Sequence, residues 1–181
     1  MSHAGLPAFV RDVHFIEDRV TALERAVDAV QSATGAAWVA AYTPDGDGLF
    51  TVGAAAGEMP FGALDAVDHD DEAMVALRAE RGALDAPVGS VLAGALVLPF
   101  VAGGRITGLL AVGAVPYAYT PAERESLMAV ASAVGLAIEV LQGHALRREL
   151  ARCRERAEWA ERELAVLHRV LDGPPSHAEI R

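Results

Sequence analysis

The stretch that decides the fold runs from Leu96 to Leu141 and reads LVLPFVAGGRITGLLAVGAVPYAYTPAERESLMAVASAVGLAIEVL. Two apolar runs, Ala95–Val101 and Ile106–Val112, flank a turn with two glycines, a pattern typical of a β-hairpin. Further on, Thr120-Pro121-Ala122-Glu123 is a capping box with proline at the first helical position. The stretch therefore predicts a central hairpin followed by a long apolar helix that extends to about Leu141.

A second hairpin is predicted nearer the N-terminus. Ala36–Thr43 and Leu49–Ala54 are rich in β-branched, aromatic and small residues, and Pro44-Asp45-Gly46-Asp47-Gly48 separates them. Residues 55–69 contain many Gly, Pro and Asp residues and are expected to be irregular. A short helix is predicted from about Asp71 to Arg81, because acidic residues fill its first turn.

The N-terminal region carries one apolar helical stripe with alternating spacings of three and four residues. This stripe predicts a helix from about Val10 to Ala33, which Gly35 would end. A smaller stripe of Phe15 and alanines lies beside the main one, so the helix is expected to contact both its own sheet and another helix. The residues of the main stripe are Val13, Ile16, Val20, Leu23, Val27 and Val30, and we assigned the first four to a dimer interface.

After the long helix, apolar residues follow spacings of 4, 3, 4, 3, 4, 3 and 4. This heptad pattern predicts a coiled coil over residues 143–171, and Asp172-Gly173-Pro174-Pro175 would stop it. The a positions are Leu150, Ala157, Leu164 and Leu171, and the d positions are Leu146, Cys153, Ala160 and Leu167.

The charged flanks of the coiled coil favour two parallel copies in register. In that arrangement each g residue faces the e residue five positions later on the partner, and no such pair here is repulsive. The alternative is a lone amphipathic helix that folds back on its own domain. In the parallel dimer, Cys153 would face its own copy, either as a small apolar residue of the seam or in a redox-linked disulfide. The three g–e pairs are Glu149 with Arg154, Arg156 with Glu161, and Glu163 with His168.

Composition narrows the function. A chain of 181 residues can hold one well-packed domain plus an extension. All 15 basic residues are arginine, and residues 1–142 hold 7 of them against 18 Asp and Glu, which disfavours nucleic acid as a partner. No uninterrupted apolar run reaches the length of a membrane helix, and the N-terminus has no signal-peptide pattern. These features, with a single cysteine, predict a cytoplasmic protein that does not contact membranes.

Motifs of catalysis and metal binding are absent from the sequence. The six histidines show no HExxH or other ligand spacing, and there is no GxSxG, Walker or dinucleotide fingerprint. The densest polar cluster, Asp68-His69-Asp70-Asp71-Glu72, lacks a calcium-loop pattern, and we interpret it as a solvated loop and helix N-terminus. The sequence therefore predicts a protein that is not an enzyme and binds no metal.

The order of helix, hairpin, irregular segment, hairpin and long helix, together with the strings GLLAVG and YTPAERESL, resembles GAF domains. The resemblance covers about residues 13–142 and implies an α/β fold with a central antiparallel sheet of about six strands flanked by helices. The domain layout is then an N-terminal tail (1–12), a GAF-like domain (13–142), a coiled-coil helix (143–171) and a flexible tail (172–181). It also implies sensory or regulatory work, a ligand pocket on the sheet face opposite the terminal helices, and dimerisation through those helices.

The resemblance does not name a cofactor or ligand. The NKFDE-type motif of cyclic-nucleotide binders is missing, Cys153 lies outside the domain where bilin binders place their cysteine, and one cysteine is too few for a free methionine sulfoxide reductase. Two interpretations remain open: a sensor that relays small-molecule binding to a partner protein through the coiled coil, and a dimerisation scaffold whose pocket is filled by its own side chains. The candidate pocket residues are Trp38, Tyr42, Phe50, Met59, Phe61, Met74 and Leu77.

Overall fold

The computed structural model describes residues 5–45, 47–60, 65–113 and 118–171, apart from the side chains of residues 14 and 169–171. The predicted tail at 172–181 lies outside these residues. The chain divides into two compact units, Met1–Leu141 and Gln142–Arg181.

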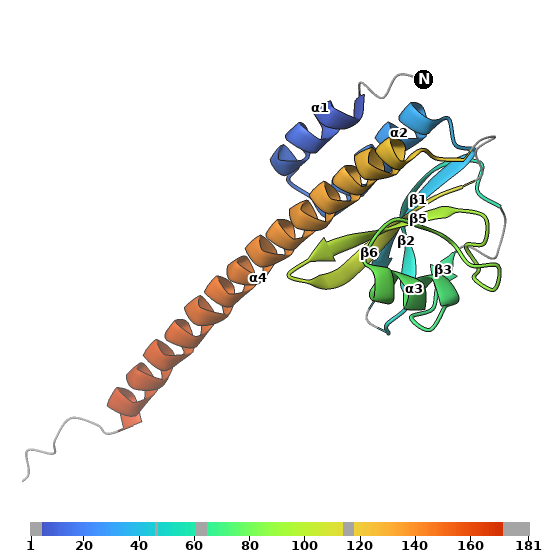
Figure 1. Cartoon of the computed structure of the whole chain (residues 1–181). Coiled ribbons are helices and arrows are strands. Elements are labelled where there is room, and N and C mark those ends of the chain that lie inside the picture. The colour runs from blue at the N-terminus through green and yellow to red at the C-terminus, as the bar shows by residue number, and fades with distance from the viewer. Residues whose placement is uncertain (1–4, 46, 61–64, 114–117, 172–181) are drawn as a thin grey trace, which may run out of the picture. The chain divides into compact units, whose positions relative to one another are not determined.

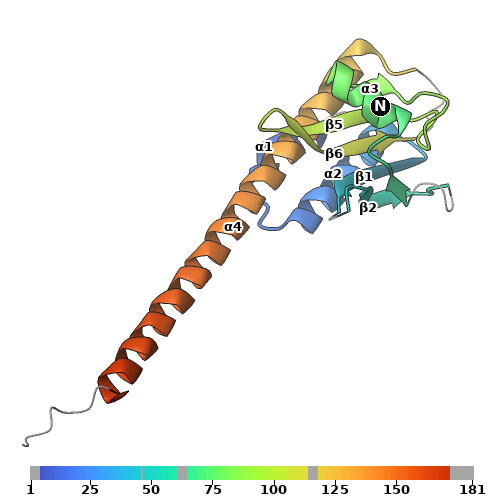
Figure 2. The same ribbon diagram turned by 90° about the horizontal axis from the view of Figure 1, so that it is seen from below.

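The first unit is built on one six-stranded sheet with strand order β3-β2-β1-β6-β5-β4. Every neighbouring pair in this sheet is antiparallel. The order of the four long strands can be followed in Figure 2. The strands are β1 (Trp38–Pro44), β2 (Phe50–Gly57), β3 (Ala66–Val67), β4 (Leu84–Asp85), β5 (Leu96–Ala102) and β6 (Arg105–Val112).

Both predicted hairpins are confirmed. β1 and β2 pair through Tyr42 and Val52, and β5 and β6 pair through Leu98 and Leu110. Because β6 also pairs with β1, the two hairpins join at the centre of the sheet. The edge strands β3 and β4 were not predicted, since two residues are too few to show an alternating pattern.

The N-terminal helix differs from its prediction. In place of one helix from Val10 to Ala33, the chain forms α1 (Gly5–Asp12), the 3-10 turn η1 (Val13–Phe15) and α2 (Arg19–Thr34). The break is at Asp18, which is the N-cap of α2. Its backbone is extended, and its side-chain oxygen accepts a hydrogen bond from the Thr21 amide at 2.8 Å, so a new helix begins there. Within the predicted N-terminal tail, residues 5–12 form a helix, and Leu6 of this helix is buried in the core.

Two apolar cores cover the two faces of the sheet. On one face, α2 and the first part of the last helix, α4 (Pro121–Leu171), pack on side chains such as Val39, Leu98 and Leu110. On the other face, α3 (Glu72–Glu80) packs on Tyr42, Leu109 and their neighbours. Figure 1 shows α3 on the side of the strands away from α2. The alternation of side chains along each strand thus divides the apolar residues between the two layers.

The last helix, α4 (Pro121–Leu171), begins at the predicted capping box. The Thr120 amide donates to Glu123 Oε2 at 2.8 Å, and the Glu123 amide donates back to Thr120 Oγ1 at 3.3 Å. These reciprocal bonds satisfy amides that have no partner within the helix. The helix continues without a break at Gly143.

By length and composition alone, α4 could also cross a membrane. It contains an 18-residue window with a mean hydropathy of 1.6, of which 44% is buried. Several of its apolar side chains, among them Leu127, Val130 and Val134, pack in the core against the sheet. Their burial accounts for a large part of this apolarity without a membrane.

Candidate functional site

The predicted pocket residues do come together, but as a packed core. Trp38 and Tyr42 of β1 lie in one buried cluster with Phe50 of β2. Met74 and Leu77 of α3 cover them, and Met59 packs at the margin. Phe61, also predicted, lies outside the described residues. The described residues therefore share one face as expected, and their side chains pack against one another. Their role in binding a ligand stays a prediction.

Tyr42 illustrates how deeply the residues of this core are buried. Its side chain is fully buried, and burial raises the pKa of the phenol well above its usual value, with the negative charge of Asp65 adding to the effect. The hydroxyl therefore stays protonated at any physiological pH. Tyr42 acts as a structural core residue rather than as a group that exchanges protons.

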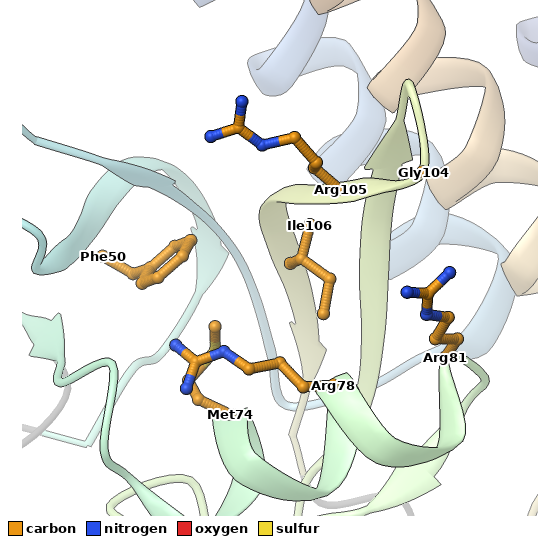
Figure 3. A pocket seen from close by; sticks show the side chains of 7 residues that line it. All are labelled: Phe50, Met74, Arg78, Arg81, Gly104, Arg105 and Ile106. Atoms are coloured by element: carbon orange, nitrogen blue, oxygen red, sulfur yellow. The ribbon is translucent and has the colours of Figure 1, made fainter.

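An open pocket of about 280 Å³ lies at the edge of this core. Figure 3 shows its lining side chains, which come from α3, from the start of β2 and from the turn between β5 and β6. Of the predicted residues, only Phe50 and Met74 contribute to it. We call it the arginine pocket, lined by Phe50, Met74, Arg78, Arg81, Gly104, Arg105 and Ile106.

Local structure places the three arginines of this pocket. Arg78 is on the last turn of α3, and Arg81 is the C-cap, with a left-handed φ of 53° and its amide bonded to the Leu77 carbonyl at 2.8 Å. Arg105 begins β6 directly after Gly103 and Gly104, whose φ values of 54° and 74° form the tight hairpin turn. The pocket therefore combines a helix end with a hairpin tip.

The arginine pocket is electropositive in an acidic chain. The chain has a formal net charge of −10, yet no described residue forms an ion pair with Arg78, Arg81 or Arg105. These three arginines could not be predicted from the sequence, because neither their spacing nor their neighbours distinguish them. Only the pairing of β5 with β6 and the packing of α3 on β5 bring Arg105 near the end of α3.

Asp71 anchors the N-terminal end of α3. Its Oδ1 accepts from the Ala73 amide at 2.8 Å and from Ser90 Oγ at 2.6 Å, and its Oδ2 accepts from the Val91 amide at 3.0 Å. One carboxylate thus caps the helix and ties it to the turn that precedes β5. This tie holds α3, and with it two of the pocket arginines, in place.

Replacing Asp71 by alanine should destabilise the domain by about 2–3 kcal/mol, because a helix cap and two further hydrogen bonds are lost. The midpoint of thermal unfolding should fall by roughly 4–12 °C for a chain of this size. The matched control is Asp70→Ala, since the Asp70 side chain is exposed and pairs with the exposed His69, and its backbone amide is kept in the variant. Equal midpoints for the two variants, measured by calorimetry, would contradict the anchoring role.

The acidic cluster forms an exposed turn. His69 Nδ1 lies 2.8 Å from Asp68 Oδ1, and His69 Nε2 lies 3.3 Å from Asp70 Oδ1. The Asp70 amide donates to Asp68 and, as the largest cause, holds the pKa of that carboxyl below its usual value. The three side chains are close enough to share a metal ion, but all are exposed and already bonded to one another. Our interpretation as a solvated loop stays a prediction.

The residues predicted for a dimer interface fall into two groups. Val13 and Leu23 are each only 1% exposed within a single chain, so they pack inside the domain and must be removed from that interface. Ile16 is half-buried beside Val13, and Val20 is exposed. Seven of the eight coiled-coil residues, namely Leu146, Leu150, Cys153, Ala157, Ala160, Leu164 and Leu167, are exposed on α4, and the side chain of Leu171 is not described.

Charged residues of the second unit also pair within one helix. Arg154 lies 3.9 Å from Glu158, and Arg162 lies 3.7 Å from the same residue. Arg154 was predicted to face Glu149 of a second copy, so in the single chain it has an alternative partner. Such exposed pairs stabilise by at most about 1 kcal/mol, so they would not prevent a change of partner.

Solved structures with this fold include proteins of several kinds. The GAF domain of an Acinetobacter phosphoenolpyruvate-protein phosphotransferase has a TM-score of 0.66 at 14% identity over 77% of this chain and 93% of that one. A bacteriophytochrome from R. palustris has a TM-score of 0.64 at 17% identity, over 84% of this chain and 40% of that one. Free methionine-R-sulfoxide reductase from Neisseria meningitidis has a TM-score of 0.63 at 19% identity, over 77% and 89%.

Sequence comparison gives the family. A search of curated proteins finds no match. The family model described as GAF domain matches residues 18–138, which is more than half of the chain and takes in all six strands. The chain therefore belongs to the GAF domain family.

Proposed function

We propose that this chain is a sensory module that forms a parallel homodimer through its helices and relays the binding of a small molecule to a partner protein. GAF domains are in general sensory and regulatory signalling modules, and the similar bacteriophytochromes are examples. The proposal adds the dimer, the ligand and the relay to this general role.

The observation that carries the proposal is the unpartnered apolar seam of α4. Leu146, Leu150, Leu164 and Leu167 are all more than half exposed and recur at heptad spacing. A helix with such a stripe is covered in solution by another helix, because burying each leucine stabilises by about 1.5–3 kcal/mol. A second copy of the same helix offers the same register, which makes it the simplest partner.

The part of α4 within the first unit also has exposed apolar side chains. Leu136 lies fourteen residues, or two heptads, before Leu150, and it is about half exposed although its neighbours in the sequence are buried in the core. Val140, one turn later, is exposed to a similar degree. The same helix thus buries one side on the sheet and offers another side to a partner, which supports dimerisation through the terminal helices.

The arginine pocket supports the sensory part of the proposal. It is an open cavity on the α3 side of the sheet, next to the face on which the ligand is predicted to bind. No catalytic reaction belongs to the proposal, because the sequence carries no nucleophile motif and its one cysteine is exposed on α4. We propose a cytoplasmic location, because a chain with one cysteine carries no internal disulfide of the kind typical of secreted domains.

One observation favours a second candidate function. The core around Trp38, Tyr42 and Leu77 is filled by the chain itself, as expected for a dimerisation scaffold without a ligand. In that case the coiled coil would present partners at a fixed geometry, and the arginine pocket would be an empty surface feature. The two functions differ in whether a small molecule occupies the dimer.

Native mass spectrometry on freshly isolated protein should give a mass twice that of the 18.9 kDa chain, plus the mass of a bound small molecule. An empty dimer would favour the scaffold, and a monomer would overturn both functions. A control sample passed through denaturant and refolded should lose the extra mass but remain dimeric, because the ligand is not covalently attached.

A further inference from the structure

We propose that the arginine pocket binds a small organic dianion that also carries an apolar part. Arg78, Arg81 and Arg105 would hold the acidic groups, and Phe50 and Ile106 would contact the apolar part. This inference rests on the proposed sensory function and deepens it by naming the chemical class of the ligand.

The three arginines concentrate positive charge at the pocket. Guanidinium groups are always protonated, so the pocket gathers three positive charges around about 280 Å³. Some arginines elsewhere in the described chain have carboxylate partners, such as Arg124 with Asp85 at 2.7 Å, whereas others, such as Arg19 and Arg25, form no ion pair with a described residue. The pocket arginines have no such partner, although the chain is strongly acidic. An anion would relieve their mutual repulsion and accept their hydrogen bonds.

The positions of the three arginines around the pocket also favour a binding site. A basic residue in the last turn of a helix complements the helix dipole, which accounts for Arg78 alone. Arg105 comes from the hairpin between β5 and β6, and in Figure 3 its side chain lies beyond Ile106 and extends away from α3. In Figure 3 the Arg78 side chain extends towards the Phe50 side of Ile106, while Arg81 lies on the other side. The positive groups therefore surround the apolar floor.

The backbone of Arg81 has an unusual conformation. Among the described residues it is the only one other than glycine with a positive φ, at 53°. This conformation costs a non-glycine residue about 1–2 kcal/mol, and glycine is the usual residue at such a helix end. Gly82 follows immediately, so the chain keeps arginine at the strained position beside a glycine. Strain of this kind concentrates at binding sites, where the side chain is needed.

The apolar side chains of the pocket indicate the chemistry of the part of the ligand that carries no acidic group. Met74 is fully buried and Phe50 nearly so, and Ile106 is half-buried. Of these three side chains, Ile106 therefore leaves the most apolar surface in water. A purely inorganic anion would not cover that surface, whereas a ring or short aliphatic segment would. The volume is slightly below the usual range for ligand pockets, which limits the ligand to a small molecule.

The test uses the full-length protein labelled with ¹⁵N, with the arginine Nε–Hε signals as the readout. The probes are phenyl phosphate and phenylsuccinate, and the comparators are inorganic phosphate and phenol. We expect at least one probe to shift three arginine signals saturably below about 10 mM, and to bind at least tenfold more tightly than either comparator. The probe that binds more tightly identifies the acidic group.

Variants assign the signals and supply the controls. The double variant Arg78→Gln/Arg105→Gln should bind the probe at least tenfold more weakly, while Arg25→Gln, exposed on α2, should bind as the wild type does. Arg81→Gly should raise the unfolding midpoint and weaken binding, a combination that a purely structural arginine would not give. Unchanged backbone amide spectra verify that the exposed arginines are not needed for folding.

Two outcomes would overturn the inference: no saturable shift with either probe, or equal binding by the wild type and the double variant. The proposed function fails separately. A monomer that binds phenyl phosphate through these arginines would refute the dimeric relay and retain the pocket. A dimer that carries a small molecule without any change in the arginine signals would do the reverse.

Discussion

Leu164→Asp is expected to convert the dimer into a monomer. Each copy would lose a leucine from the seam, worth about 1.5–3 kcal/mol, and would place a carboxylate opposite its own copy. A loss of about 3–6 kcal/mol raises the dissociation constant by more than a hundredfold. Analytical ultracentrifugation over a range of protein concentrations measures this directly, while the domain itself should remain folded.

Val166→Asp is the matched control for this prediction. Val166 is 57% exposed in the single chain and Leu164 is 56% exposed, so both substitutions place a new charge at an equally accessible site on α4. Only Leu164 is at an a position, whereas Val166 and the exposed Trp159 lie at c positions, outside the two-stranded seam. Dissociation of both variants, or of neither, would contradict the proposed register.

Local signals explain why most of the fold could be predicted. The capping box at Thr120 and Glu123 and the glycine turn at Gly103 and Gly104 each act over a few residues, and the structure has both as predicted. The two hairpins then follow from their turns and from the apolar runs beside them. The joining of the two hairpins, by contrast, came from the family resemblance, since no local signal specifies which strands pair.

The break in the N-terminal helix shows where periodicity misleads. Val13 and Leu23 continue one apolar stripe, but they belong to different elements that both bury side chains against the same domain. The stripe therefore indicated burial correctly at most of its positions but not at Val20, which is exposed, and it indicated a continuous helix wrongly. The sequence does contain a signal for the break, because Asp18 is a favourable N-cap residue and lies three residues before Thr21.

The pocket could be predicted only in part, because it depends on contacts between distant segments. That Trp38 and Tyr42 share a face follows from the alternation of a strand, and they do lie in one core. Whether that face is open or filled depends on how α3 packs over it. The arginines of the pocket come from the end of α3 and from a hairpin turn 24 residues after Arg81, and no spacing rule links them.

Gly135→Leu is expected to destabilise the domain by about 3 kcal/mol and to lower its unfolding midpoint by roughly 6–12 °C. A Cβ at this position of α4 would lie 3.0 Å from the Val101 amide nitrogen and 3.1 Å from its carbonyl oxygen. These are backbone atoms of β5, which cannot move without disturbing the sheet. Gly135→Ala should show a smaller loss of the same sign.

Gly143→Ala is the control within the same helix. No atom lies within 4 Å of a Cβ built there, so the substitution should stabilise α4 by up to about 1 kcal/mol, the usual gain when alanine replaces a helical glycine. Calorimetry of Gly135→Ala and Gly143→Ala therefore compares one chemical change at two sites with opposite expected signs. A rise in the midpoint for both would mean that α4 does not approach β5 this closely.

The contact at Gly135 also bears on how a signal could travel. Val101 lies on β5 just before the turn that carries Arg105, and α4 continues from Gly135 into the heptad seam. A ligand that moves the turn would therefore act on the backbone that α4 touches. If the proposed relay operates, Gly135→Ala should reduce the effect of phenyl phosphate on the dimer dissociation constant while leaving the arginine signals responsive; an unchanged effect would exclude this contact from the relay.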